Sequence, residues 1–155
     1  MVRDAVSSIQ NFLEIPPDLG TGGQPTEPQL SGLSAAGYTM VINLAMPQSE
    51  EALVNEDFLV TAQGIDYVHL PVPWEAPTQD HVLKFFDLVE ANRGGKTFVH
   101  CMRNMRVAVF VYLYRVCRRD IPAESAQEDL LRIWRPRGVW RRLIVDLVGE
   151  DACPI

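Results

Sequence analysis

The stretch that decides the fold is TFVHCMRNMRVAVFVYLY, residues 97–114. Residues 97–100 form a short apolar run typical of a buried strand. Residues 107–114 form a longer apolar run without Gly or Pro, which predicts a helix. Between the two runs lies Cys101. The first N–H groups of a helix, and the positive end of its dipole, point at such a turn. They stabilise a thiolate or an oxyanion, so the stretch predicts a reactive cysteine beside an anion site.

The turn carries the pattern HCx4R over residues 100–106. On a strand, loop and helix, this pattern resembles the active-site loop of the cysteine-dependent phosphatases. The chain more closely resembles a bacterial phosphatase-like domain related to dual-specificity tyrosine phosphatases, which occurs alone or within beta-lactamase-hydrolase-like proteins. The resemblance covers about residues 11–119 and includes residues 21–26 (TGGQPT) and 41–44 (VINL). It implies a cysteine-phosphatase-like fold and hydrolysis of a phosphoester through a cysteinyl-phosphate intermediate.

The resemblance also implies roles for the residues of this loop. Cys101 matches the nucleophile that attacks phosphorus. Arg106 matches the arginine that binds the phosphate oxygens bidentately. His100 precedes the nucleophile as it does in the family, where it orients the loop. The other candidates for the anion-binding loop are Met102, Arg103, Asn104 and Met105. Without the resemblance, the alternative interpretations are a buried structural thiol for Cys101 and a core histidine for His100.

A general acid must protonate the leaving oxygen. Family members carry this acid on the loop that follows the strand before the cysteine strand. Here that loop spans residues 73–77 (PWEAP), and Glu75 is the candidate by position. Asp80 is the alternative, although acidic side chains are favoured in the first turn of a helix for structural reasons alone.

The loop departs from the common tyrosine phosphatase pattern in three ways. It has four residues between Cys101 and Arg106 instead of the usual five, it contains no glycine, and Val107 and Ala108 stand where a Ser or Thr is usual. Asn104 is a candidate substitute for the glycine, because Asn tolerates left-handed backbone best among the other residues. A loop this short also resembles that of rhodanese-type sulfurtransferases, in which the cysteine carries a persulfide. The sequence therefore leaves three functions open: a phosphatase-like hydrolase, a sulfurtransferase, and a catalytically weak module that binds an anion or phosphorylated ligand.

Apolar runs and turn signals predict strands that alternate with helices. Strands are expected at residues 11–15, 38–44, 66–72 and 97–100, and a glycine-rich turn at residues 20–25. Helices are expected at residues 26–37, 49–64, 78–94, 107–114, 121–134 and 140–148. This alternation predicts an α/β fold with three layers, in which helices flank a mainly parallel central sheet. Ligands bind such sheets beyond the carboxyl ends of the strands.

Local signals define several of these helices. Thr26, with Gln29 three residues later, predicts a capping box, and Thr78 is expected to cap another helix. The helix at residues 49–64 is expected to have an apolar stripe that includes Val54 and Phe58.

Length and charge bound the class of protein. At 155 residues, the chain is expected to form one domain over residues 1–155, with a core at about 11–119 and C-terminal helices at about 121–149. The net charge is −6, divided as −9 over residues 1–98 and +3 over residues 99–155. An acidic protein is a poor general binder of nucleic acid. Because the cationic part contains the cysteine loop, a small anionic or phosphorylated ligand is expected.

Other features lead us to expect a cytoplasmic protein without a membrane partner. No run approaches the ~20 apolar residues of a membrane span, and residues 1–8 lack the apolar core of a signal peptide. Three cysteines cannot all pair, which favours a reducing compartment. We expect no metal and no cofactor. The sequence leaves the substrate and the oligomeric state open.

Overall fold

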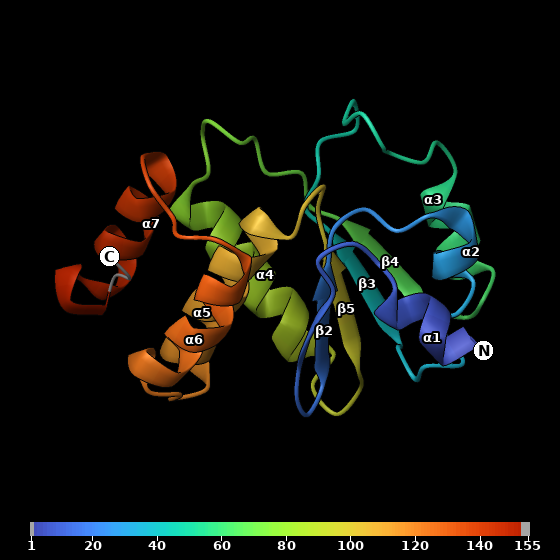
Figure 1. Ribbon diagram of the computed structural model, residues 1–155, viewed down its shortest axis with the longest axis horizontal. Helices are drawn as coiled ribbons and strands as arrows, with labels where there is room; N and C mark the ends of the chain where they lie inside the picture. Colours follow the sequence, from blue (N-terminus) through green and yellow to red (C-terminus); the bar gives the residue numbers. More distant parts are fainter. Residues whose placement is uncertain (1, 153–155) are drawn as a thin grey trace.

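The computed structural model describes residues 2–152 and contains a five-stranded sheet with helices on both faces (Figure 1). Its strands are β1 (Leu13–Ile15), β2 (Leu19–Gly22), β3 (Met40–Asn43), β4 (Asp66–His69) and β5 (Thr97–His100). Their order is β1-β2-β5-β3-β4. β1 pairs antiparallel with β2, and the other three pairings are parallel. The predicted α/β fold with a mainly parallel sheet is confirmed, and the cysteine strand β5 lies at its centre.

The helices lie on the two faces of the sheet (Figure 1). On one face are α1 (Val2–Ser7), α2 (Glu27–Leu30) and α3 (Glu56–Thr61). On the other are α4 (Gln79–Ala91), α5 (Met105–Arg118), α6 (Ala123–Ile133), α7 (Val139–Val148) and the 3₁₀ turn η1 (Glu150–Ala152). Within residues 2–152, no helix is both long enough and apolar enough to cross a membrane.

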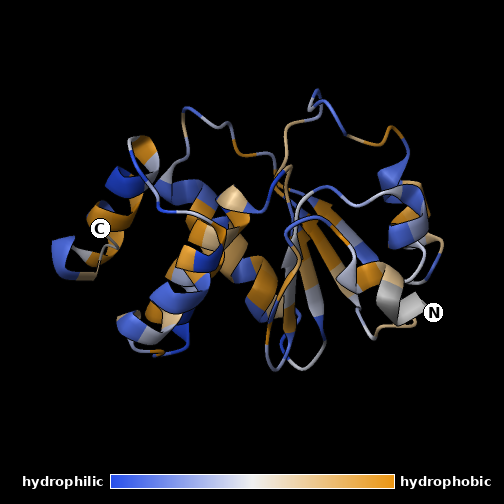
Figure 2. Cartoon of the chain, in the orientation of Figure 1, coloured by the Kyte–Doolittle hydropathy of each residue, from blue (hydrophilic) through white to orange (hydrophobic). Residues whose placement is uncertain are grey.

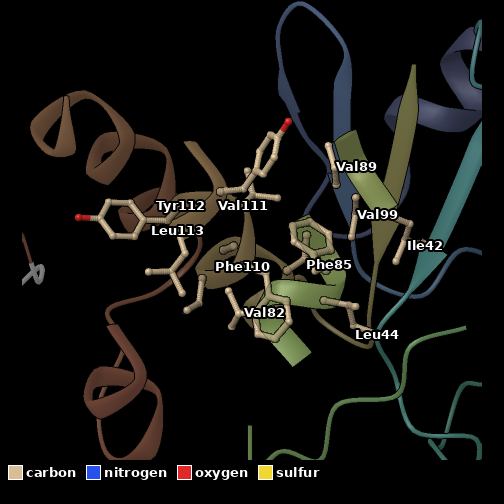
Figure 3. Packing of buried hydrophobic residues seen from close by; sticks show 14 of the residues in the cluster. Ile42, Leu44, Val82, Phe85, Val89, Val99, Phe110, Val111, Tyr112 and Leu113 are labelled. Atoms are coloured by element: carbon tan, nitrogen blue, oxygen red, sulfur yellow. The ribbon is translucent and has the colours of Figure 1, made fainter. Parts of the chain in front are cut away.

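Two apolar clusters form the core because alternate side chains of a strand face opposite sides of the sheet. On β5, Phe98 packs in the cluster beneath α1–α3, whereas Val99 belongs to the larger cluster beneath α4–α7. Figure 3 shows the larger cluster, in which Phe85 of α4 and Phe110 of α5 meet with ring centroids 5.6 Å apart. In Figure 2, hydrophobic stretches in orange are mixed with paler ones along the strands of the sheet. This packing fixes α5 against β5 and so fixes the turn between them.

The glycine-rich turn predicted at residues 20–25 is wrong in part, because residues 19–22 form strand β2. β2 lies between β1 and β5, where a Cβ on Gly20 would collide with the ring and hydroxyl of Tyr38. A Cβ on Gly22 would lie 2.9 Å from a methyl group of Ile9. These glycines therefore allow close approach of other groups to an extended strand.

The helix predicted at residues 49–64 is also wrong in length. Only Glu56–Thr61 is helical, and Val54 and Phe58, expected on the buried stripe, are 103% and 67% exposed. The buried residues of this helix are Glu56 and Val60. The helix predicted at residues 26–37 is shorter as well: Thr26 forms the expected capping box, but α2 ends at Leu30 and turns follow.

Candidate active site

The loop between β5 and α5 contains the residues that the sequence singled out. Cys101 follows β5 directly, and α5 begins at Met105. Between them, Asn104 has left-handed backbone (φ 68°) and a fully buried side chain. Its Nδ2 donates to the carbonyl of Asn11 at 2.7 Å and to Oγ1 of Thr21 at 3.1 Å. Asn104 thus adopts the conformation expected of the missing glycine and also ties the loop to its neighbours.

Distant segments hold the loop through its backbone. The N–H of Gln24 donates to the carbonyl of Met102 at 3.0 Å, and the N–H of Cys101 donates to the carbonyl of Gly22 at 3.4 Å. Trp134, at the end of α6, donates its indole N–H to the carbonyl of Met105 at 2.9 Å. The glycine-rich segment after β2 and the C-terminal helices therefore both support the loop.

Cys101 and Arg106 line the same pocket, which has a volume of about 240 Å³. Trp74, Met102, Arg103 and Met105 complete its walls. The guanidinium of Arg106 lies 5.6 Å from the centroid of the Trp74 ring, and its Nε is buried without a hydrogen-bond partner. Among the residues described, Arg106 makes no ion pair. A cation in the first turn of a helix opposes the helix dipole, so this pocket suits an anion.

Arg103 differs from Arg106 in that other side chains already engage it. Its guanidinium donates to Oε1 of Gln10 at 3.1 Å and lies 3.6 Å from Oε1 of Glu51. Arg103 is therefore held at the rim of the pocket.

A second pocket of about 300 Å³ adjoins the first, with Trp74 and Met105 lining both. Its aromatic wall consists of Trp74, Trp134 and Trp140, whose ring centroids lie 5.3–6.4 Å apart. Glu75 lines this second pocket and not the pocket of Cys101. Asp80, the alternative acid, is exposed in the first turn of α4. Of the two acids, Glu75 is thus the one beside the site.

His100 is fully buried behind the loop, where it meets an acid that sequence reasoning missed. Its Nε2 lies 2.6 Å from Oε2 of Glu56, and its Nδ1 lies 3.2 Å from the carbonyl of Cys101. Burial alone would raise the pKa of Glu56. Hydrogen bonds from His100, Gln24 and Tyr67, together with attraction to the His100 ring, hold the pKa below its ordinary value.

One sequence signal could have identified Glu56. It precedes Val60 by four residues, so the two side chains lie on one face of a helix. An acid on an apolar face requires a partner. The residues around Glu56 do not indicate that its partner is His100, which lies 44 residues away on β5.

The remaining chemistry of the described residues is limited. Val107 and Ala108, which replace the usual hydroxyl residues, are both buried. Cys117 is an exposed free thiol in the last turn of α5, although its surroundings still shield it enough to raise its pKa. Cys153 lies outside the described residues. Within residues 2–152, no group of three His, Cys, Asp or Glu residues is placed to hold a metal ion.

Several solved structures have a similar fold. A DUF442 candidate phosphatase from Shewanella putrefaciens CN-32 is 31% identical, with a TM-score of 0.85, over 93% of this chain and 95% of that one. The catalytic domain of the PP-IP phosphatase SIW14 from S. cerevisiae, solved with citrate, is 15% identical over 92% of this chain and 87% of that one (TM-score 0.72). TpbA from P. aeruginosa, solved with pTyr, is 17% identical over 77% of this chain and 71% of that one (TM-score 0.63). Identities of 15% and 17% show a shared fold alone.

The search of curated proteins finds no match to this chain. A family model described as "DSP-PTPase phosphatase fused to NAD+ Kinase" matches residues 14–136, which is most of the chain. Cys101 and Arg106 both lie within the matched residues. The chain therefore belongs to this family of dual-specificity phosphatase-like domains.

Proposed function

We propose that this protein is a cysteine-dependent phosphatase that hydrolyses phosphomonoesters through a cysteinyl-phosphate intermediate. The observation that carries the proposal is the pocket shared by Cys101 and Arg106. The arginine has a buried Nε without a partner and no ion pair among the described residues, while Cys101 lies in the loop that leads into α5. A phosphate group would satisfy the arginine, whose planar fork matches two of its oxygens.

The reaction would proceed in two steps. In the first, the Cys101 thiolate forms a bond to phosphorus as the bond to the leaving oxygen breaks, and that oxygen takes a proton from an acid. Arg106 and backbone N–H groups stabilise the charge on the remaining oxygens. In the second step, water attacks phosphorus and gives a proton to the carboxylate that the acid has become. The sulfur of Cys101 leaves as thiolate. The products are an alcohol and inorganic phosphate.

Glu75 is our candidate for the acid, and aryl phosphates are our candidate substrate class. A leaving group that extends from the Cys101 pocket enters the adjoining pocket walled by three tryptophans, where an aromatic ring can stack. Glu75 lines that same pocket, so it lies on the side where the leaving oxygen would depart. We propose roles for Met102, Arg103, Asn104 and Met105 only in shaping the anion loop.

The experiment is pre-steady-state hydrolysis of p-nitrophenyl phosphate. We expect a burst of nitrophenol followed by slower turnover, because no hydroxyl at Val107 or Ala108 helps the thiolate to leave. Cys101→Ser should abolish turnover, and Cys117→Ser should leave it unchanged. Arg106→Ala should lower kcat/KM by at least about a hundredfold, and Arg106→Lys should restore only part of the loss, because lysine lacks the fork.

Two results would replace this proposal. A persulfide on Cys101 after treatment with thiosulfate, formed at catalytic rates while the aryl phosphate stays intact, would establish a sulfurtransferase. Phosphate binding that depends on Arg106, with no turnover of either substrate, would establish a binding module. Mass spectrometry of the intact protein and calorimetric titration with phosphate distinguish these outcomes.

A further inference from the structure

The Glu56–His100 pair is a buried acid and base directly behind the candidate nucleophile. Glu56 is 3% exposed, and His100 is fully buried. Glu56 comes from α3, on the sheet face opposite α5, and reaches the strand that carries the cysteine. A buried carboxylate is costly unless it is paired and hydrogen-bonded, so its presence here indicates a specific task.

Both ring nitrogens of His100 face acceptors. Nδ1 lies 3.2 Å from the carbonyl oxygen of Cys101, which can only accept, so Nδ1 carries a proton. Nε2 lies 2.6 Å from Oε2 of Glu56. If Glu56 is ionised, Nε2 must donate too, and the ring is then an imidazolium.

The surroundings of Glu56 favour its ionised form. The amide nitrogen of Gln24 donates to Oε1 at 2.8 Å, and a second contact of that nitrogen, to the carbonyl of Pro25 at 3.1 Å, identifies it as the donor end of the amide. The hydroxyl of Tyr67 accepts from Nδ2 of Asn43 at 3.1 Å, which leaves its own proton for Glu56. A carboxylate that accepts several hydrogen bonds stays charged.

We propose that Glu56 is a positioning residue that holds His100 as an imidazolium against the loop, which keeps Cys101 ionised and fixes the orientation of its carbonyl. The positive ring favours a thiolate next to it. The Nδ1–H bond turns the carbonyl of Cys101 toward the sheet. The inference rests on the proposed role of Cys101 as nucleophile, but its chemistry concerns the thiol and not turnover.

Other polar groups around the pair are compatible with this assignment. Tyr67 and His69 of β4 and Asp57 of α3 line the same cavity as Glu56, together with Asn43 of β3. Burial, together with the nearby Glu56 charge, raises the pKa of Tyr67, so it remains a neutral donor. His69 is engaged elsewhere, with Nε2 2.6 Å from the carbonyl of Ala45. His100 is thus the base paired with Glu56.

The first test measures the rate of Cys101 alkylation by iodoacetamide as a function of pH. Glu56→Gln keeps the shape and a hydrogen-bond acceptor but removes the charge, so alkylation at about pH 6 should slow by about tenfold and recover at high pH. Asp57→Asn is the matched control, because it removes the same charge from the same helix without contact with His100, and its profile should follow the wild type. Identical profiles for the two variants would overturn the proposal.

The second test needs no variant. NMR of wild-type protein labelled with ¹⁵N-histidine should find both ring nitrogens of His100 protonated at about pH 7, because both face acceptors. An unprotonated ring nitrogen in the folded wild type would refute the imidazolium. Because neither test measures phosphate hydrolysis, an inactive protein that passes both would retain this inference while the proposed function fails.

Discussion

Asn104 is the residue on which the shape of the anion loop depends. It combines left-handed backbone with two buried hydrogen bonds from one amide nitrogen. Asn104→Gly keeps the backbone conformation and loses the bonds, whereas Asn104→Ala loses the bonds and adds left-handed strain. We expect both variants to be less stable than the wild type, and Asn104→Ala to be less stable than Asn104→Gly by about 1 kcal/mol. Urea unfolding measures these free energies.

Asp120 provides the control for Asn104. It also has left-handed backbone (φ 53°), but its side chain is exposed. Asp120→Gly should therefore change the free energy of unfolding little. Equal stability of Asn104→Gly and Asn104→Ala would contradict the role given to the backbone.

Site residues that the sequence could predict are those close together in the chain. Cys101 precedes α5 and Arg106 lies in its first turn, so their short separation in the chain brings them into one pocket. Asn104 was predictable as a substitute for glycine because left-handed tolerance is a property of the residue itself. The pairing of Glu56 with His100 was not predictable, since the two residues lie 44 positions apart and only the tertiary fold brings them together.

Among the elements, β2 shows how tertiary packing overrides local preference. Glycines weaken a strand, yet residues 19–22 pair with both β1 and β5. Gly20 lies under the buried ring of Tyr38, so Gly20→Ala should destabilise the protein by about 1–3 kcal/mol through overpacking. An added Cβ at Gly22 meets a methyl group of Ile9 at 2.9 Å and a ring carbon of Phe98 at 3.2 Å, against 2.0 Å to the Tyr38 hydroxyl at Gly20, so Gly22→Ala should cost less. Urea unfolding measures the free energy of unfolding of both variants. An unchanged value for Gly20→Ala would contradict the overpacking argument.

Capping signals located helix starts well, but hydrophobic patterns were less reliable for helix length. Thr26 and Thr78 form capping boxes with side chains three residues later, an arrangement that sequence alone specifies. In contrast, Val54 and Phe58 fit an apolar stripe but are exposed. Periodicity indicates which side chains share a helix face, and it does not say whether a sheet covers that face.

At the scale of the whole molecule, the sheet brings three segments to one edge. The loops after β2, β3 and β5 all leave the carboxyl ends of parallel strands, which is where such folds bind ligands. The α4–α7 face adds Trp134 and Trp140, and the α1–α3 face adds Glu56. The candidate site therefore depends on both layers of helices, and the buried contact between Glu56 and His100 couples the site to global stability.

This coupling predicts an acid-sensitive fold. The pKa of Glu56 is lower in the folded protein than its ordinary value of 4.5, so below about that pH the unfolded chain binds more protons than the folded one. The stability supplied by this carboxylate is complete above the ordinary value and is lost as the pH falls through the lower, folded value. We compare wild type with Glu56→Gln/His100→Asn, which replaces the pair by two neutral amides, so that the variant has no ionisable side chain at these two positions. Urea unfolding from about pH 6 to about pH 3 should give a stability gap that narrows as the pH falls. A Glu56 gap that does not narrow relative to the gap between wild type and the Asp57→Asn control would show that folding does not lower the pKa of the Glu56 carboxyl.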